Sequence, residues 1–216
     1  YISDLHLMHR IKNAGCKSKE DVVFTIKKII DDILAESTSL TLIGGDVSSE
    51  FSIFELFVKM LRKLAGSGRR TFVFVLGNHE LWNFPGLSVD EIVDKYRTVL
   101  KENGMYLLHN DLFYRNESDD MGIIPYDELI QSDNPAILEK LRCTRLVILG
   151  GLGFSGYNEE FNANDGVYRA TVDRNTEIQE SKKFEQLYDK LTDVLAKKNT
   201  VIFTHTPKKD WCVDAK

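Results

Sequence analysis

Residues 41–48 read TLIGGDVS, and the rest of this chain can be arranged around them. Leu40, Leu42 and Ile43 form a short apolar run that ends at two glycines, a pattern that predicts a buried strand followed by a tight turn. Asp46 then comes at the carboxyl end of the strand, where open α/β folds bind their ligands. An Asp in this place is also typical of a residue that caps a turn or a helix.

Side chains of the metal-ligand type follow three other apolar runs in the same way: Asp4 and His6 after residues 1–3, Asn78 and His79 after residues 72–77, and His205 after residues 201–204. In extended geometry residues i and i+2 share a face, so Asp4 and His6 can reach one cation together. Each residue alone could be an ordinary loop residue. Their repetition after apolar runs predicts one metal site, and mixed oxygen and imidazole ligands suit Mn, Fe or Zn better than Ca.

The carboxylate of Asp46 could bridge two metal ions if it lies between two sub-sites. Ions about 3.5–4 Å apart can activate a bridging water and clamp the oxygens of an in-line phosphoryl displacement. His79 directly follows the predicted ligand Asn78. We expect it at the rim of the site, as a proton donor for the leaving oxygen or a cation for the phosphate. The alternative is that His79 is itself a ligand or supports one.

Size and composition favour a single globular domain over residues 1–216, because 43% of the 216 residues are hydrophobic. A net charge of -5 and a pI of about 5.6 give no support to a duplex-binding surface. No apolar run approaches the roughly 20 residues of a membrane span. The scattered cysteines, Cys16, Cys143 and Cys212, indicate free thiols in a reducing compartment, so we expect a soluble, cytoplasmic protein.

Apolar periodicity predicts helices and strands that alternate in the first half, as βαβ units require. The expected helices are residues 19–36 with Ser18 as N-cap, 48–65, a helix from the capping box of Ser88 and Glu91 to Leu100, part of 128–141, and 176–197. The expected strands after the first are residues 71–76, 145–149 and 200–204. The prediction is therefore an α/β fold.

Four segments are interpreted as loops or turns. Residues 9–18 are polar and mixed, and residues 116–120 form a polar loop. Residues 109–111 are interpreted as the turn of a hairpin between 105–108 and 112–114. Both His9 and His109 are interpreted as loop or surface histidines. The long aromatic and polar segment 154–169 could stack a base or cover the fold as a cap.

Taken in order, these motifs resemble those of the calcineurin-like metallophosphoesterase superfamily: D-x-H at residues 4–6, G-D at 45–46, G-N-H-[DE] at 77–80, and the lone histidine after a later strand, His205. The resemblance implies a four-layer αββα sandwich. It also implies the role of each residue: Asp4 and His6 bind the first metal ion, Asp46 bridges both, Asn78 and His205 bind the second, and His79 is the catalytic histidine.

The sequence departs from the family pattern in two places. The final G-H-x-H motif is not found before Lys216, and the opening strand is clipped, so we expect a domain trimmed at both ends. Residues 45–50 lack the Asp and Arg of the G-D-x-x-D-R-G motif, which disfavours a Ser/Thr protein phosphatase. Glu80 stands where the nuclease and cyclic-nucleotide branches usually have Asp.

The function that the resemblance implies is a metal-dependent phosphoesterase with two divalent or mixed-valence ions of Mn, Fe or Zn. A metal-bridging hydroxide would attack a phosphate mono- or diester in line, and His79 would assist the leaving group. The alternative is a non-catalytic module that keeps the fold and binds a phosphorylated ligand or a protein partner. Substrate-binding residues and oligomeric state are not readable from the sequence. The sequence carries no strong signal for nucleic acid, and we expect no membrane partner.

Overall fold

The computed structural model describes residues 1–66, 70–81, 83–84, 86–153 and 174–207. The chain divides into two compact units, the first built mainly from Tyr1–Leu107 and the second from residues after it. The predicted aromatic loop of residues 154–169 and the third cysteine, Cys212, lie outside the described residues. Cys16 and Cys143 are free thiols, as predicted.

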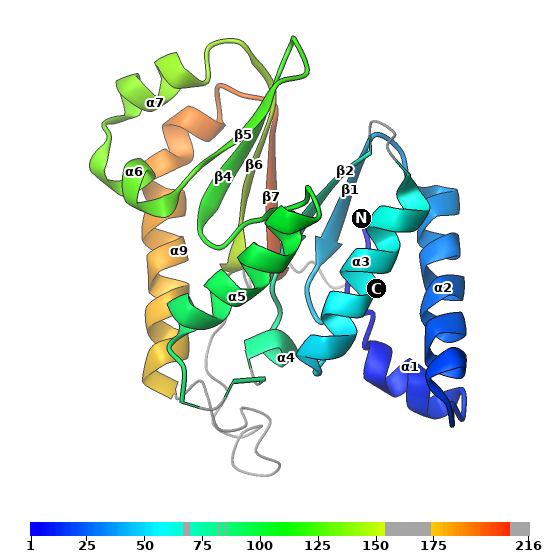
Figure 1. Ribbon diagram of the computed structural model, residues 1–216. Coiled ribbons are helices and arrows are strands. Elements are labelled where there is room, and N and C mark those ends of the chain that lie inside the picture. Colours follow the sequence, from blue (N-terminus) through cyan, green and yellow to red (C-terminus); the bar gives the residue numbers. More distant parts are fainter. Residues whose placement is uncertain (67–69, 82, 85, 154–173, 208–216) are drawn as a thin grey trace, which may run out of the picture. The chain divides into compact units, whose positions relative to one another are not determined.

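The first unit is built on a parallel sheet in the order β1-β2-β3 (Figure 1). Its strands are β1 (Leu40–Gly44), β2 (Thr71–Val75) and β3 (Tyr106–Leu107). Its helices are α1 (Leu7–Asn13), α2 (Lys19–Glu36), α3 (Phe51–Ala65), α4 (Asn78–Leu81) and α5 (Val89–Glu102). Parallel neighbours need a crossover connection, and α3 and α5 supply it, so the predicted βαβ alternation is confirmed.

Local sequence sets where α2 and α5 begin. The Ser18 hydroxyl accepts a hydrogen bond from the N–H of Asp21, whose carboxylate accepts one from the N–H of Ser18. Ser88 and Glu91 form the same reciprocal capping box at the start of α5. Each box satisfies N–H groups that have no partner inside the helix. Both predicted N-termini are therefore confirmed.

The core of the first unit lies between the sheet and its helices. Every residue of β2 is buried, and α3 buries Phe54, Phe57, Val58 and Leu61. The ring of Phe54 packs edge-on against Tyr96 of α5, with the ring centroids 4.7 Å apart. Such aromatic pairs add about 0.5–1.5 kcal/mol to the area that they bury. The complete burial of β2 fixes the strand that leads into residues 77–80.

The second unit contains a mixed sheet in the order β5-β4-β6-β7. Its strands are β4 (Asp111–Asn116), β5 (Met121–Ile124), β6 (Thr144–Gly153) and β7 (Thr200–Thr206). Its described helices are α6 (Tyr126–Gln131), α7 (Asn134–Lys140) and α9 (Arg174–Leu195). A core of buried apolar residues holds α9 to this sheet, among them Leu112, Leu149, Phe184, Leu187 and Leu191. The parallel pair β6–β7 brings the carboxyl ends of these two strands together.

Two local predictions are wrong. Residues 109–111 are no hairpin turn: β3 pairs in parallel with β2, β4 opens the other sheet, and the hairpin joins β4 to β5 instead. A two-residue strand whose partner is far away in sequence leaves no local pattern. Residues 9–18 are not all loop either, because α1 buries Leu7 and Ile11 on one face.

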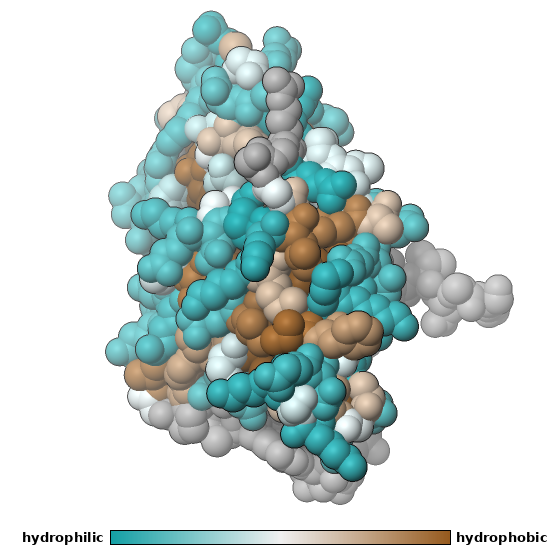
Figure 2. Space-filling view, turned by 45° about the vertical axis from the view of Figure 1, so that its right-hand side comes forward, coloured by the Kyte–Doolittle hydropathy of each residue, from teal (hydrophilic) through white to brown (hydrophobic). Residues whose placement is uncertain are grey.

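The surface view in Figure 2 shows mostly hydrophilic residues, which surround a smaller patch of apolar ones. Exposed apolar side chains of α2 include Val23 and Phe24. Among the helices that the structure describes, none combines the length and the apolar character that a membrane crossing requires.

Burial predicts that replacing two phenylalanines of the first unit has very different effects on stability. Phe54 is fully buried, whereas the side chain of Phe24 is 70% exposed. We expect Phe54→Ala to lower the free energy of unfolding by about 3–5 kcal/mol, because it removes buried contacts and leaves a cavity. The matched Phe24→Ala should change it by less than about 0.5 kcal/mol. Urea unfolding of both variants tests this, and equal losses would contradict the placement of Phe54.

Candidate metal centre

Three backbone segments of the first unit meet where β1 and β2 end. The opening residues run alongside β1 and its loop: the N–H of Ile2 donates to Leu42, that of Asp4 to Gly45, and that of His6 to Asp46, at 2.9, 3.1 and 2.9 Å. The loop after β2 starts at Leu76 and leads into α4. Because the carboxyl ends of parallel strands share one edge of the sheet, the side chains of these segments come together there.

The backbone at this edge is not extended. Asp4, His6 and Asp46 have φ values of 55°, 43° and 51°, in the left-handed region that non-glycine residues rarely adopt. The prediction that Asp4 and His6 share one face of a strand is therefore wrong, although their side chains do lie together, with His6 Nε2 3.7 Å from Asp4 Oδ1. Such conformations cost about 1–3 kcal/mol each and concentrate at functional sites.

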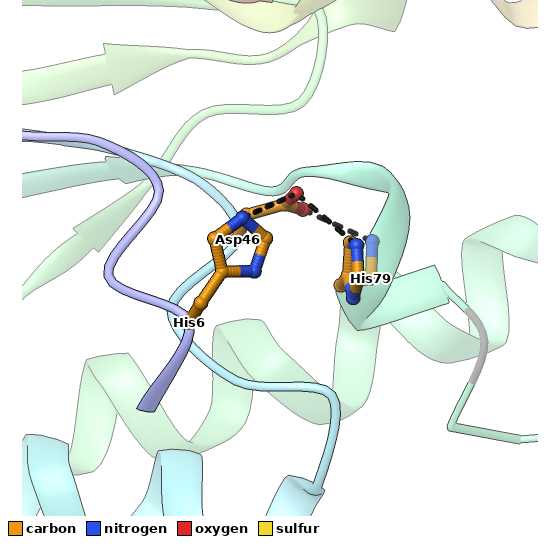
Figure 3. Close-up of side chains that lie close together, drawn as sticks. All are labelled: His6, Asp46 and His79. Atoms are coloured by element: carbon orange, nitrogen blue, oxygen red, sulfur yellow. Dashed lines mark hydrogen bonds and ion pairs between the residues drawn. The ribbon is translucent and has the colours of Figure 1, made fainter. Parts of the chain in front are cut away.

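Asp46 lies between two imidazole rings from different loops (Figure 3). Its Oδ2 atom is 3.8 Å from Nε2 of His6 and 3.7 Å from Nε2 of His79, and the ring centroids of the two histidines are 4.8 Å apart. The carboxylate is almost completely buried, and its Oδ1 atom accepts a hydrogen bond from the N–H of His79 at 3.0 Å. Both histidines are thus held against one carboxylate.

These residues fit a divalent metal ion. One ligand atom from each of His6, Asp46 and His79 lies within 4.8 Å of the other two. Two ligands that are each about 2.0–2.2 Å from a zinc-like ion lie up to about 4 Å from each other, and separations of 3.7 and 3.8 Å leave that space. A carboxylate with two imidazoles is a donor set that Zn, Mn and Fe accept.

Of the predicted site residues, the first unit brings together Asp4, His6, Asp46 and His79. Asn78 is the first residue of α4 and immediately precedes His79. His205 belongs to the second unit, where it is half-buried near the end of β7. That all of them converge on one centre stays a prediction. The contact of His79 with Asp46 leaves both of its predicted roles open, as catalytic residue or as ligand.

Two glycines allow the loops after β1 and β2 to touch through their backbones. A Cβ atom on Gly77 would lie 2.1 Å from Oδ1 of Asp46, and one on Gly45 would lie 2.5 Å from the backbone nitrogen of Gly77. Neither distance is possible between non-bonded atoms. The glycines of the G-D and G-N-H motifs are therefore packing requirements at this centre.

Glu80 is a buried member of the centre that the sequence interpretation missed. Its side chain is fully buried beneath the two loops. Burial and the nearby Asp46 carboxylate raise the pKa of Glu80 to about 7, although hydrogen bonds from the N–H groups of Gly77, Ser48 and Asp46 lower it. Its position directly after His79 was the signal in the sequence that could have indicated it. An acidic residue in a polar motif, however, is typical of an exposed position.

A separate hollow of the first unit lies elsewhere. It has a volume of about 560 Å³ and is lined by α2, the start of β1 and the opening residues, with Ile2, Ile33 and Leu40 among its walls. None of the predicted site residues in the described part of the chain lines it. We therefore assign it no part in the chemistry of the metal centre.

Comparison with known proteins identifies a family for this chain. Residues 1–214 match the sequence model of a family described as calcineurin-like phosphoesterase. A search of curated proteins found no match. The matched range contains every predicted site residue: Asp4, His6, Asp46, Asn78, His79 and His205.

The close approach of the loops predicts that Gly77→Ala disrupts the centre. The added methyl group would overlap the Asp46 carboxylate and push it from the imidazoles, so we expect at least about a tenfold loss of Mn²⁺ affinity. Gly66→Ala is the matched control, because its Cβ would meet nothing within 4 Å and only its positive φ of 69° is strained. Calorimetric Mn²⁺ titration tests both variants. Wild-type affinity in Gly77→Ala would show that the loops can separate.

Proposed function

Because this chain belongs to the calcineurin-like phosphoesterase family, we propose that it hydrolyses a phosphate monoester or diester with the help of two divalent metal ions. Family membership confirms the resemblance and the predicted αββα fold class, whose two sheets and their helices are present. The observation that carries the proposal is the buried Asp46 carboxylate within 3.7–3.8 Å of imidazoles from two loops.

The proposed ligand set divides between the two ions. Asp4 and His6 would hold the first, and their side chains already lie 3.7 Å apart. Asp46 would be shared, and Asn78 and His205 would hold the second. A shared carboxylate suits this arrangement, because its negative charge offsets the repulsion between two cations. Mn, Fe and Zn all accept these ligands.

When bound, the ions would supply the Lewis acidity that activates a water and stabilises the charge on the phosphoryl group. The protein supplies the positions of the groups around them. The hydrogen bond from the His79 N–H to Asp46 fixes where the His79 side chain begins, and that side chain keeps 21% of its surface exposed. We propose that this imidazole protonates the leaving oxygen, which general acid catalysis would speed by about 10²–10⁴-fold.

Removing the charge of Asp46 tests its bridging role. We expect Asp46→Asn to lose at least one metal ion and most of the hydrolysis, since a neutral amide cannot hold two dications, while the fold is largely kept. Asp31→Asn is the control, because Asp31 is exposed and pairs only with Lys27 among the contacts described for it. Metal analysis and hydrolysis of a nitrophenyl ester are the measurements. Wild-type turnover in Asp46→Asn would rule out the bridge.

Replacing His79 separates proton donation from metal binding. We expect His79→Ala to keep both ions and to lose turnover, with a larger loss for an alkyl than for an aryl phosphate ester. A nitrophenolate leaves almost without a proton, whereas an alkoxide needs one. The measurement is kcat for both esters, with metal content determined on the same samples.

His9→Ala provides the matched histidine control. The exposed His9 also lies against the ring of His6, at 5.7 Å between centroids, but no contact with Asp46 is described for it. Its turnover should stay close to that of the wild type. Metal loss in His79→Ala would identify His79 as a ligand, and equal losses on both esters would indicate that it stabilises phosphate charge instead.

A further inference from the structure

We propose that Glu80 is a positioning residue that ties the loop carrying Asp46 to the loop carrying Asn78 and His79, so that metal affinity depends on its carboxylate. The part of this inference that concerns turnover rests on the proposed function. The part that concerns metal binding can be tested without any substrate.

Hydrogen bonds from both loops end on this one carboxylate. Its Oε2 atom accepts from the backbone N–H of Asp46 at 2.9 Å and from that of Gly77 at 2.8 Å, and its Oε1 atom accepts from Ser48 at 3.1 Å. Asp46 and Ser48 follow β1, whereas Gly77 follows β2. The strands have ended at these positions, so the sheet supplies no acceptor for these buried donors.

The chemistry of the side chain matters as much as its position. An ionised carboxylate offers only acceptors, and all three of these contacts are with donors. A glutamine has one oxygen, so its NH₂ group would face at least one of these N–H groups. An aspartate keeps both oxygens but is shorter by one C–C bond, about 1.5 Å, which is enough to break these hydrogen bonds.

The same contacts orient the candidate ligands. Glu80 holds the N–H of Asp46, and Asp46 in turn accepts the N–H of His79 through Oδ1, which closes a ring of hydrogen bonds between the two loops. Asp46 has the strained φ of 51° within this ring. A rigid hold on its backbone therefore determines where its Oδ2 atom lies relative to His6 and His79.

A second set of contacts anchors Glu80 without involving the carboxylate. The hydroxyl of Tyr96 donates to the backbone carbonyl of Glu80 at 3.1 Å, and the amide of Asn83 donates to the Tyr96 oxygen at 2.8 Å. Tyr96→Phe thus removes a hydrogen bond to the same residue while leaving the three bonds to the loops in place. It is a matched variant for separating loss of stability from loss of positioning.

The experiment compares Glu80→Gln, Glu80→Asp and Tyr96→Phe with the wild type. Calorimetry gives the Kd of each protein for Mn²⁺, and thermal unfolding without metal gives its Tm. We expect both Glu80 variants to lose about 10–100-fold in Mn²⁺ affinity, as outer partners of metal ligands typically do. Tyr96→Phe should stay within about threefold of the wild-type affinity for Mn²⁺, even if its Tm falls as far as that of the Glu80 variants.

The exposed Glu91 supplies a further control, because it also accepts a backbone N–H, that of Ser88 at 2.8 Å, in a capping box. Glu91→Gln should bind Mn²⁺ like the wild type. If Glu80→Gln does not fold, Glu80→Asp carries the comparison.

The proposal is overturned if the Glu80 variants keep wild-type affinity, or if their affinity falls only in proportion to Tm as in Tyr96→Phe. A wild type that binds Mn²⁺ with this dependence on Glu80 but hydrolyses no phosphate ester would refute the proposed function alone. A wild type that binds no Mn²⁺ would refute both.

Discussion

Backbone contact between two loops is the constraint on which the candidate centre depends. The loops after β1 and β2 can touch only because Gly45 and Gly77 have no side chains. This contact brings the carboxylate of Asp46 under the N–H of His79, at 3.0 Å. Without it, a ligand from one loop would not lie within metal-binding distance of an imidazole from the other. The parallel pairing of β1 and β2 makes the contact possible, since it places the carboxyl ends of both strands at the same edge of the sheet.

The centre also gathers negative charge, and little water can reach two of its carboxylates. Asp46 and Glu80 are buried next to each other, and the half-exposed Asp4 lies beside His6. Burial and the charge of Asp46 explain the raised pKa of Glu80, because each disfavours the ionised form of its carboxyl group. A divalent cation near Asp46 would relieve this repulsion, so the electrostatics favour the same occupant as the ligand geometry.

The second unit shows the limits of local interpretation. His109, predicted to be a loop or surface histidine, is buried, and its Nε2 atom lies 3.1 Å from the carboxylate of Glu180 on α9. Burial raises the pKa of Glu180, but hydrogen bonds from His109 and Lys183 outweigh burial and hold it below its usual value. These partners are about 70 residues apart in sequence, so no local pattern indicates the pair.

Features that depend on neighbours along the chain could be predicted from the sequence alone. Capping boxes, helical spacing and apolar runs placed α2, α5, β1 and β2, and the ligand-type residues after those runs indicated Asp46 and His79. Three features became visible only in the folded chain: the left-handed backbone of Asp4 and His6, the pairing of β3 with β2, and the burial of Glu80. The reason is physical: each of these is fixed by contacts with a segment far away in sequence, and a one-dimensional pattern contains no distance between such segments.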